Sequence, residues 1–133
     1  MNFSLNDDQR LLKDSLDKFV RQRYGDEHRR ATIHQKQSLD PAIWAQFSDL
    51  GWLALPFDEA DGGLGGSLVD TMIVMEAFGR GLIVEPYMAS VVLGGGCLQR
   101  AKSAEQRELL QALMAGHLQL ALAIDEYEQL HDL

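Results

Sequence analysis

The sequence has a single cysteine, Cys97, and is short of basic residues, and each shortage excludes a class of protein. One cysteine cannot form an internal disulfide, so the chain is not a disulfide-stabilised secreted domain. The 12 Lys and Arg residues are outnumbered by 20 Asp and Glu residues, and the net charge of −8 repels nucleic-acid phosphates and anionic membrane surfaces. Charges and glycines interrupt every apolar run well before bilayer length. We expect neither a nucleic-acid partner nor a membrane partner.

The first residues lack an export signal, and the sequence lacks a metal-binding pattern. Residues 1–8 contain no basic residue and no apolar run, so we expect a cytoplasmic protein. The histidines follow no metal-ligand spacing, and no cysteine lies near them, so no metal site is predicted. Cys97 follows three glycines and is predicted to be a buried small hydrophobe rather than a nucleophile. The four histidines are His28, His34, His117 and His131.

Helical periodicity dominates what is present. The 133 residues are 46% hydrophobic, enough for one domain with a real core. Asn6 has the character of an N-cap, and behind it Leu12, Leu16, Phe19 and Val20 fall at i, i+4, i+7 and i+8 on one helical face. The pattern predicts an all-α protein, a bundle of five or six helices.

The other elements are marked by caps and glycines. Ile43, Trp44, Phe47 and Leu50 form the stripe of the third helix, so Trp44 and Phe47 are expected in the core and Gln46 and Asp49 in water. Leu118–Ile124 alternates in part and predicts a strand without a partner in this chain. The expected helices cover 7–24, 26–37, 41–50, a segment from Ser67 or Asp70 to Phe78, a segment opened by Glu85-Pro86, and 103–115.

Two groups of glycines need separate explanations. Gly62-Gly63-Leu64-Gly65-Gly66-Ser67 has no Lys-Ser/Thr ending and follows no predicted strand, so it is a structured connector rather than a phosphate loop. Gly94-Gly95-Gly96 interrupts a predicted helix, where each glycine costs about 1 kcal/mol relative to alanine. Such a run predicts close approach of another element or of a ligand.

The order of these motifs resembles the N-terminal helical domain of the acyl-CoA dehydrogenase family. The resemblance extends over nearly the whole chain, and its most specific parts are the block from Trp44 through the glycine loop and the sequence EAFGR. Glu85-Pro86-Tyr87-Met88-Ala89-Ser90 is similar to the small-subunit-like and steroid- or dicarboxylate-degrading branch. The motifs are FSLNDDQR at 3–10, WAQFSDLG at 44–51, WLALP at 52–56, DGGLGGS at 61–67, EAFGR at 76–80, SAEQR at 103–107 with Leu109-Leu110, and Gly116.

The resemblance implies a three-domain parent enzyme that binds FAD and acts on an acyl-CoA substrate. It implies that 1–116 is the helical domain and that 117–133 begins a truncated middle β-domain, with the strand at 118–124 as its first strand. The family's catalytic base is usually in the C-terminal domain and has no counterpart here, so no catalytic residue is assigned. Partners implied are the remaining domains or a partner subunit, in a homo- or hetero-oligomer.

Two sets of site residues follow from the resemblance. Leu122, Ala123, Ile124 and Asp125 match the start of the family's flavin-contacting strand, although Asp125 replaces the usual threonine and the following Gly-Ser pair is absent. The predicted helix from Pro86 to Gly94 matches the family helix that lines the acyl-chain cavity. Its small residues leave room for a slot, and helix–helix close packing is the competing explanation. The substrate-binding candidates are Tyr87, Ala89, Ser90, Leu93 and Gly94.

The expected function is α,β-dehydrogenation of an acyl-CoA thioester by the parent flavoprotein. Deprotonation and hydride transfer need groups on both faces of the substrate, so this chain alone is expected to be inactive and not to retain FAD. A flavin oxidase or monooxygenase of the same fold stays open within the enzyme class. The alternative class is a stand-alone helical interaction module without flavin.

Overall fold

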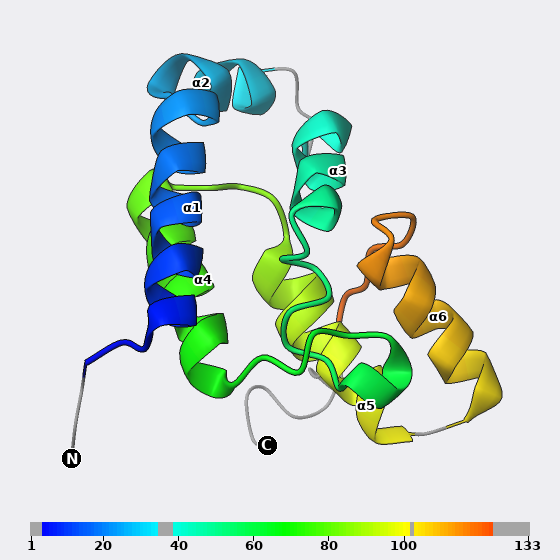
Figure 1. Cartoon of the computed structure of the whole chain (residues 1–133). Helices are drawn as coiled ribbons and strands as arrows, with labels where there is room; N and C mark the ends of the chain where they lie inside the picture. Colours follow the sequence, from blue (N-terminus) through cyan, green and yellow to red (C-terminus); the bar gives the residue numbers. More distant parts are fainter. Residues whose placement is uncertain (1–3, 35–38, 102, 124–133) are drawn as a thin grey trace, which may run out of the picture.

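The computed structural model describes residues 4–34, 39–101 and 103–123, and within these ranges the protein is helical with no strand (Figure 1). The predicted all-α class is confirmed for this part of the chain. The elements in order are α1 (Asp7–Arg23), α2 (Asp26–His34), α3 (Pro41–Asp49), the 3₁₀ turn η1 (Glu59–Asp61), α4 (Leu68–Gly81), the π-helical segment η2 (Met88–Gly95), α5 (Gly96–Ala101) and α6 (Ala104–Met114).

Local capping sequences set where the helices begin. Asn6 Oδ1 accepts a hydrogen bond from the Gln9 backbone N–H at 2.8 Å, and Gln9 Oε1 accepts one from the Asn6 N–H at 3.1 Å. This reciprocal pair satisfies two donors that the first turn of a helix otherwise leaves unpaired. Ser67 and Ser103 cap α4 and α6 in the same way, and Asp40 caps α3 ahead of Pro41.

An aromatic cluster forms the centre of the core. Phe47 on α3 stacks on Phe78 of α4 with ring centroids 4.7 Å apart, and it meets Phe19 of α1 edge-on at 5.6 Å. Trp44 is 2% exposed and Phe47 is fully buried, as the sequence predicted. On the opposite side of α3, Asp49 is exposed and Gln46 is only half-buried.

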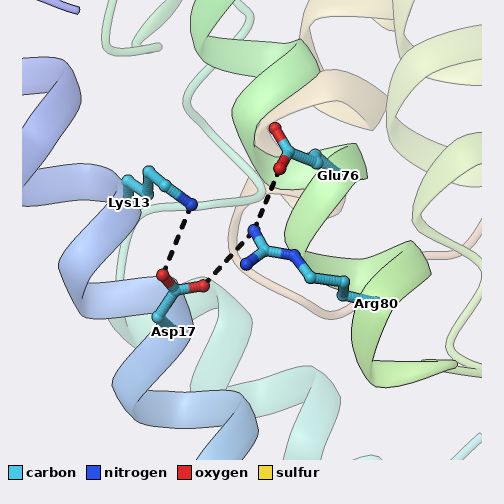
Figure 2. A network of polar contacts seen from close by, with 4 residues as sticks. All are labelled: Lys13, Asp17, Glu76 and Arg80. Atoms are coloured by element: carbon cyan, nitrogen blue, oxygen red, sulfur yellow. Dashed lines mark hydrogen bonds and ion pairs between the residues drawn. The ribbon is translucent and has the colours of Figure 1, made fainter.

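Helices α1 and α4 lie side by side (Figure 1) and are joined at the surface by a chain of charges (Figure 2). The Asp17 carboxylate on α1 lies 3.4 Å from Lys13 Nζ and 3.5 Å from Arg80 Nη2 on α4, and Arg80 Nη2 is also 3.2 Å from Glu76 Oε1. Arg80 is half exposed, and surface ion pairs contribute about 0–1 kcal/mol each. The network therefore sets the register of the two helices more than it stabilises them.

Helix α4 is longer than the sequence predicted. The predicted end at Phe78 is wrong, because α4 continues through Gly79 to Gly81 and is capped by Leu82 in the left-handed conformation at φ 49°. Glycine at 81 reflects packing instead of helix termination. A Cβ there would lie 2.9 Å from Val20 of α1, so the close approach of α1 and α4 requires its absence.

Two further predictions are wrong, and a third lies partly outside the described residues. Residues 118–123 form no strand: the described chain offers them no partner strand, and the Leu120 backbone bonds to a side chain instead. Ile124, the last residue of that predicted strand, is outside the described residues. Cys97 is exposed, since α5 buries none of its residues. Helix α2 ends at His34, whereas the predicted end at Gln37 lies in the undescribed segment 35–38.

Candidate functional site

The π-helical segment η2 is the most unusual element of the fold. Its eight residues, Met88–Gly95, replace an ordinary helix with the wider i→i+5 turn and continue without a break into α5. Such segments are rare and occur often at functional sites. The five predicted substrate-binding residues all lie on η2 or immediately before it. We therefore describe the surroundings of η2 residue by residue.

Tyr87 is a buried anchor at the start of η2. It is 1% exposed, its hydroxyl donates to the Trp52 backbone carbonyl at 3.0 Å, and its ring packs edge-on against Phe78 at 5.2 Å. Burial raises the pKa of Tyr87 well above its usual value. The phenol stays protonated at neutral pH and fixes η2 to the Trp52 loop.

Ser90 and Gly94 face a segment of the same chain. The Ser90 hydroxyl accepts from the Leu120 N–H at 3.0 Å and donates to the Leu120 carbonyl at 2.9 Å. Gly94 lies one turn further along, and a Cβ on it would be 2.6 Å from Leu120 Cβ. The space left by the small side chains at 90 and 94 is therefore occupied by Leu120.

The close approach predicted for the glycine run is present. The Phe57 ring and Leu113 of α6 would both collide with a Cβ on Gly95, and Leu120 would collide with one on Gly94. Gly96 is different, because a Cβ there meets only the flexible Arg100 guanidinium at 3.7 Å. Two of the three glycines thus allow other parts of the chain to pack directly on η2.

The outer side of η2 is apolar and accessible. Met88 is 51% exposed, Leu93 is 43% exposed and Ala89 is half-buried. Two hollows lie between α4 and the adjacent side of η2 and α5, and Ala89 and Leu93 line neither of them. One, of about 270 Å³, is lined by Met75, Phe78, Leu82 and Met88 among others. The other, of about 330 Å³, is lined by Leu68, Val92, Gln99 and Arg100 among others.

Helix α4 also carries exposed apolar side chains. Leu68 is 89% exposed, Met72 is 55% exposed, and Leu82 at the helix end is 56% exposed. Exposed apolar side chains on a helix that also packs in the core are expected where a second protein surface covers them. We call Leu68, Met72, Leu82, Met88 and Leu93 the apolar face.

A buried carboxylate fixes the chain just before η2. Glu85 is 5% exposed, and its Oε1 accepts from the Asp40 N–H at 3.3 Å. The Tyr24 hydroxyl accepts from the Val84 N–H at 2.9 Å, next to Glu85 in the chain. Burial, assisted by the Glu85 charge, raises the pKa of Tyr24 far above its ordinary value. These contacts attach the start of η2 to α1 and α3.

The glycine loop and the predicted cofactor contacts differ in how they are placed. The glycine loop is closed on its own backbone: a Cβ on Gly66 would be 2.5 Å from the Leu55 carbonyl oxygen, and one on Gly63 would collide with Phe57. Its N–H groups donate to backbone carbonyls of residues 54–59, so the loop is a structured connector. Of the predicted cofactor contacts, Leu122 and Ala123 are exposed, and Ile124 and Asp125 lie outside the described residues.

Two other kinds of site are missing from the described part of the chain. It contains no group of three or more histidine, cysteine, aspartate or glutamate side chains arranged to hold a metal ion. Within the same residues, no helix has the length and apolar content that crossing a membrane requires.

Comparison with known proteins places this arrangement in a family. The family described as "Acyl-CoA dehydrogenase, N-terminal domain" matches residues 6–117. Acyl-CoA dehydrogenase FadE27 of Mycobacterium tuberculosis is 33% identical over 100 residues, which are 74% of this chain and 27% of FadE27.

Two solved structures have the same fold. A chain of the ChsE4-ChsE5 complex from Mycobacterium tuberculosis superposes with a TM-score of 0.86 at 30% identity, covering 97% of this chain and 36% of that one. The FAD complex of PigA superposes with a TM-score of 0.70 at 24% identity, covering 90% and 32%, which shows the fold alone. The chain thus spans about a third or less of these relatives. With the family match over residues 6–117, it belongs to the acyl-CoA dehydrogenase family as that family's N-terminal domain.

Proposed function

We propose that this chain is the N-terminal domain of an FAD-dependent enzyme that dehydrogenates an acyl-CoA thioester between its α and β carbons. The 133-residue chain is inactive alone in this proposal. The single observation that carries it is the apolar face beside the π-helical η2, which leaves five large apolar side chains between 43% and 89% exposed. Residues 1–116 form the helical domain, and 117–133 lead toward a β-domain. The substrate branch is steroid- or dicarboxylate-degrading.

The outer side of η2 is the acyl-binding surface in this proposal. Ala89 and Leu93 contact the acyl chain, because they lie on its accessible side. Tyr87, Ser90 and Gly94 support them from behind, because each is buried against the chain's own residues. Apolar side chains recognise an acyl chain by burial, with few polar contacts.

The cofactor site is shared in this proposal. FAD, when bound, accepts the hydride that leaves the substrate β carbon. Leu122, Ala123, Ile124 and Asp125 give one edge of its site, and the rest comes from the remaining domains or from a partner subunit. The catalytic base also lies outside this chain.

The apolar face supports assembly with that larger partner. Exposed apolar patches of this kind mark protein–protein contacts, and the solved relative ChsE4-ChsE5 is a complex of two named proteins. The net charge of −8 keeps the isolated chain soluble despite the patch.

The test is co-expression with the polypeptide encoded next to this chain, followed by a flavin absorbance spectrum and an acyl-CoA-dependent dye-reduction assay. A yellow complex that reduces the dye supports the proposal. A colourless complex supports the alternative, an interaction module without flavin. A stable, soluble chain that binds no neighbouring polypeptide contradicts both.

Paired variants locate the contact surface in the same experiment. Leu68→Glu with Met72→Glu places two charges on the apolar face and should abolish co-purification. Leu11→Glu is the matched control, because Leu11 is also an exposed leucine, 68% exposed on α1. Equal loss of co-purification from both would show that the apolar face is not the contact surface.

A further inference from the structure

The Ser90 hydroxyl makes two hydrogen bonds to one residue that lies 30 positions away in the sequence. Ser90 is fully buried on η2, and its Oγ accepts from the Leu120 N–H at 3.0 Å and donates to the Leu120 carbonyl at 2.9 Å. A serine hydroxyl has one donor and two acceptor positions, so this contact satisfies both polar groups of the Leu120 backbone. In the absence of a strand partner, Ser90 takes the place of a neighbouring strand for that residue.

Gly94 makes the contact possible. A Cβ at position 94 would lie 2.6 Å from Leu120 Cβ and 3.2 Å from its Cδ1, which real side chains do not tolerate. The segment can therefore reach Ser90 only because the residue one turn later has no side chain. Ser90 and Gly94 form a seat for Leu120 on η2.

The segment is also fixed where it leaves α6. Gly116 adopts φ 76°, its N–H donates to the Leu113 carbonyl, and the His117 N–H donates to the Ala112 carbonyl, each at 2.9 Å. This is the hydrogen-bond pattern of a Schellman motif, which needs a left-handed residue at its centre. The Ser48 hydroxyl then holds the Met114 carbonyl at 2.8 Å, which ties the end of α6 to α3.

We infer that Ser90 is a positioning residue that fixes residues 117–123 on η2, so that the chain leaves the domain at a set place beside the acyl-binding surface. The first half of this inference concerns this chain alone. The second half rests on the proposed function: the anchored segment contains Leu122 and Ala123, two of the proposed flavin contacts. Ser90 then sets the distance between those contacts and Ala89 and Leu93 without touching substrate or cofactor.

Amide hydrogen exchange on the 133-residue chain tests the anchor. Ser90→Ala should speed exchange at Leu120 about tenfold relative to the core amide of Val74, because the amide loses its acceptor. Ser90→Cys keeps a side chain of similar size with a weaker hydrogen-bond acceptor, so its Leu120 exchange rate should lie between those of the natural chain and Ser90→Ala. Ser15→Ala is the matched control, since it removes an exposed serine hydroxyl on α1 and should leave the ratio of Leu120 to Val74 exchange unchanged. Unchanged Leu120 exchange in Ser90→Ala contradicts the anchor.

Flavin reduction in the assembled enzyme tests the positioning role. Ser90→Ala should lower the rate of flavin reduction about tenfold with little change in KM, because the proposed acyl contacts stay in place. A raised KM with an unchanged rate would mean that Ser90 contacts substrate, and no change in either would overturn the positioning role. If the wild-type assembly holds no flavin, the proposed function and the positioning role both fail, while the exchange ratio still decides whether Ser90 anchors Leu120.

Discussion

Trp44 shows how much one side chain contributes to the core. It is 2% exposed and lies 6.1 Å from the Phe47 ring. Trp44→Ala should lower the free energy of unfolding by about 3–5 kcal/mol, through lost apolar burial and the cavity that remains. Urea denaturation monitored by circular dichroism measures the loss. Asp49→Ala on the exposed side of the same helix should change stability by less than about 0.5 kcal/mol, and equal losses would contradict the assigned faces.

The ionisation of Asp70 makes the stability that the cap of α4 contributes depend on pH. Partial burial raises the pKa of Asp70, but hydrogen bonds from the Ser67 hydroxyl and N–H, both at 2.6 Å, outweigh burial and hold the pKa below its usual value. A carboxylate with a lowered folded-state pKa contributes stability above its unfolded pKa of about 4 and loses it as pH falls through the folded value.

The expected outcome is a loss of pH dependence in Asp70→Asn. Urea midpoints at pH 6 and pH 2.5 should differ less in this variant than in the natural chain, with Asp49→Asn as the control for removing an exposed carboxylate. A difference between the two pH values as large as that of the natural chain would show that the Ser67–Asp70 cap makes no contribution to acid stability.

At the scale of elements, two helical glycines should respond in opposite directions to alanine. A Cβ on Gly79 of α4 meets nothing within 4 Å, so Gly79→Ala should stabilise the protein by up to about 1 kcal/mol through helix propensity. A Cβ on Gly95 collides with Phe57 and Leu113, so Gly95→Ala should destabilise it by about 1–3 kcal/mol. Thermal melts of the two variants show directly whether each substitution raises or lowers the stability. Stabilisation by both would mean that Phe57 does not pack on η2.

The elements that the sequence predicted well are those set by local chemistry. The caps at Asn6, Asp40, Ser67 and Ser103 depend on residues two or three positions away, so each helix start was predictable. The end of α4 was not predictable, because the glycine at position 81 is required by its packing against Val20 of α1 and does not end its own helix.

The interior of η2 was only partly predictable. The run Gly94–Gly96 indicated that another segment packs closely on this helix. It did not indicate that the contacting residues are Phe57, from a loop, and Leu120, from the segment after α6. The π-helical turn also has no distinct signature in the sequence. The sequence therefore predicted which helical segment holds the candidate residues. It did not predict the direction of each side chain, because tertiary packing determines it.

At the scale of the molecule, the apolar side chains on one side of α4 are buried, whereas those of the apolar face are exposed. The aromatic cluster between α1, α3 and α4 is buried, while Leu68, Met72 and Met88 remain more than half exposed. Surface of this kind stays favourable to bury, at about 25 cal/mol for each Å² removed from water. In the proposed assembly, this face packs against a second protein surface.

The last prediction concerns residues 117–123 as part of the fold. An alternating apolar segment without a strand partner would be expected to promote self-association, but Leu120 is half-buried and bonded to Ser90 in its own chain. A chain ending at Gly116 should therefore be less stable than one ending at Ala123, because it uncovers Ser90 and Gly94. We expect a loss of about 1–3 kcal/mol in urea denaturation, from two hydrogen bonds and one leucine contact. Sedimentation velocity should show more association for the shorter chain. Equal stability of both, or association confined to the longer chain, would show that the segment is an exposed edge instead of part of the fold.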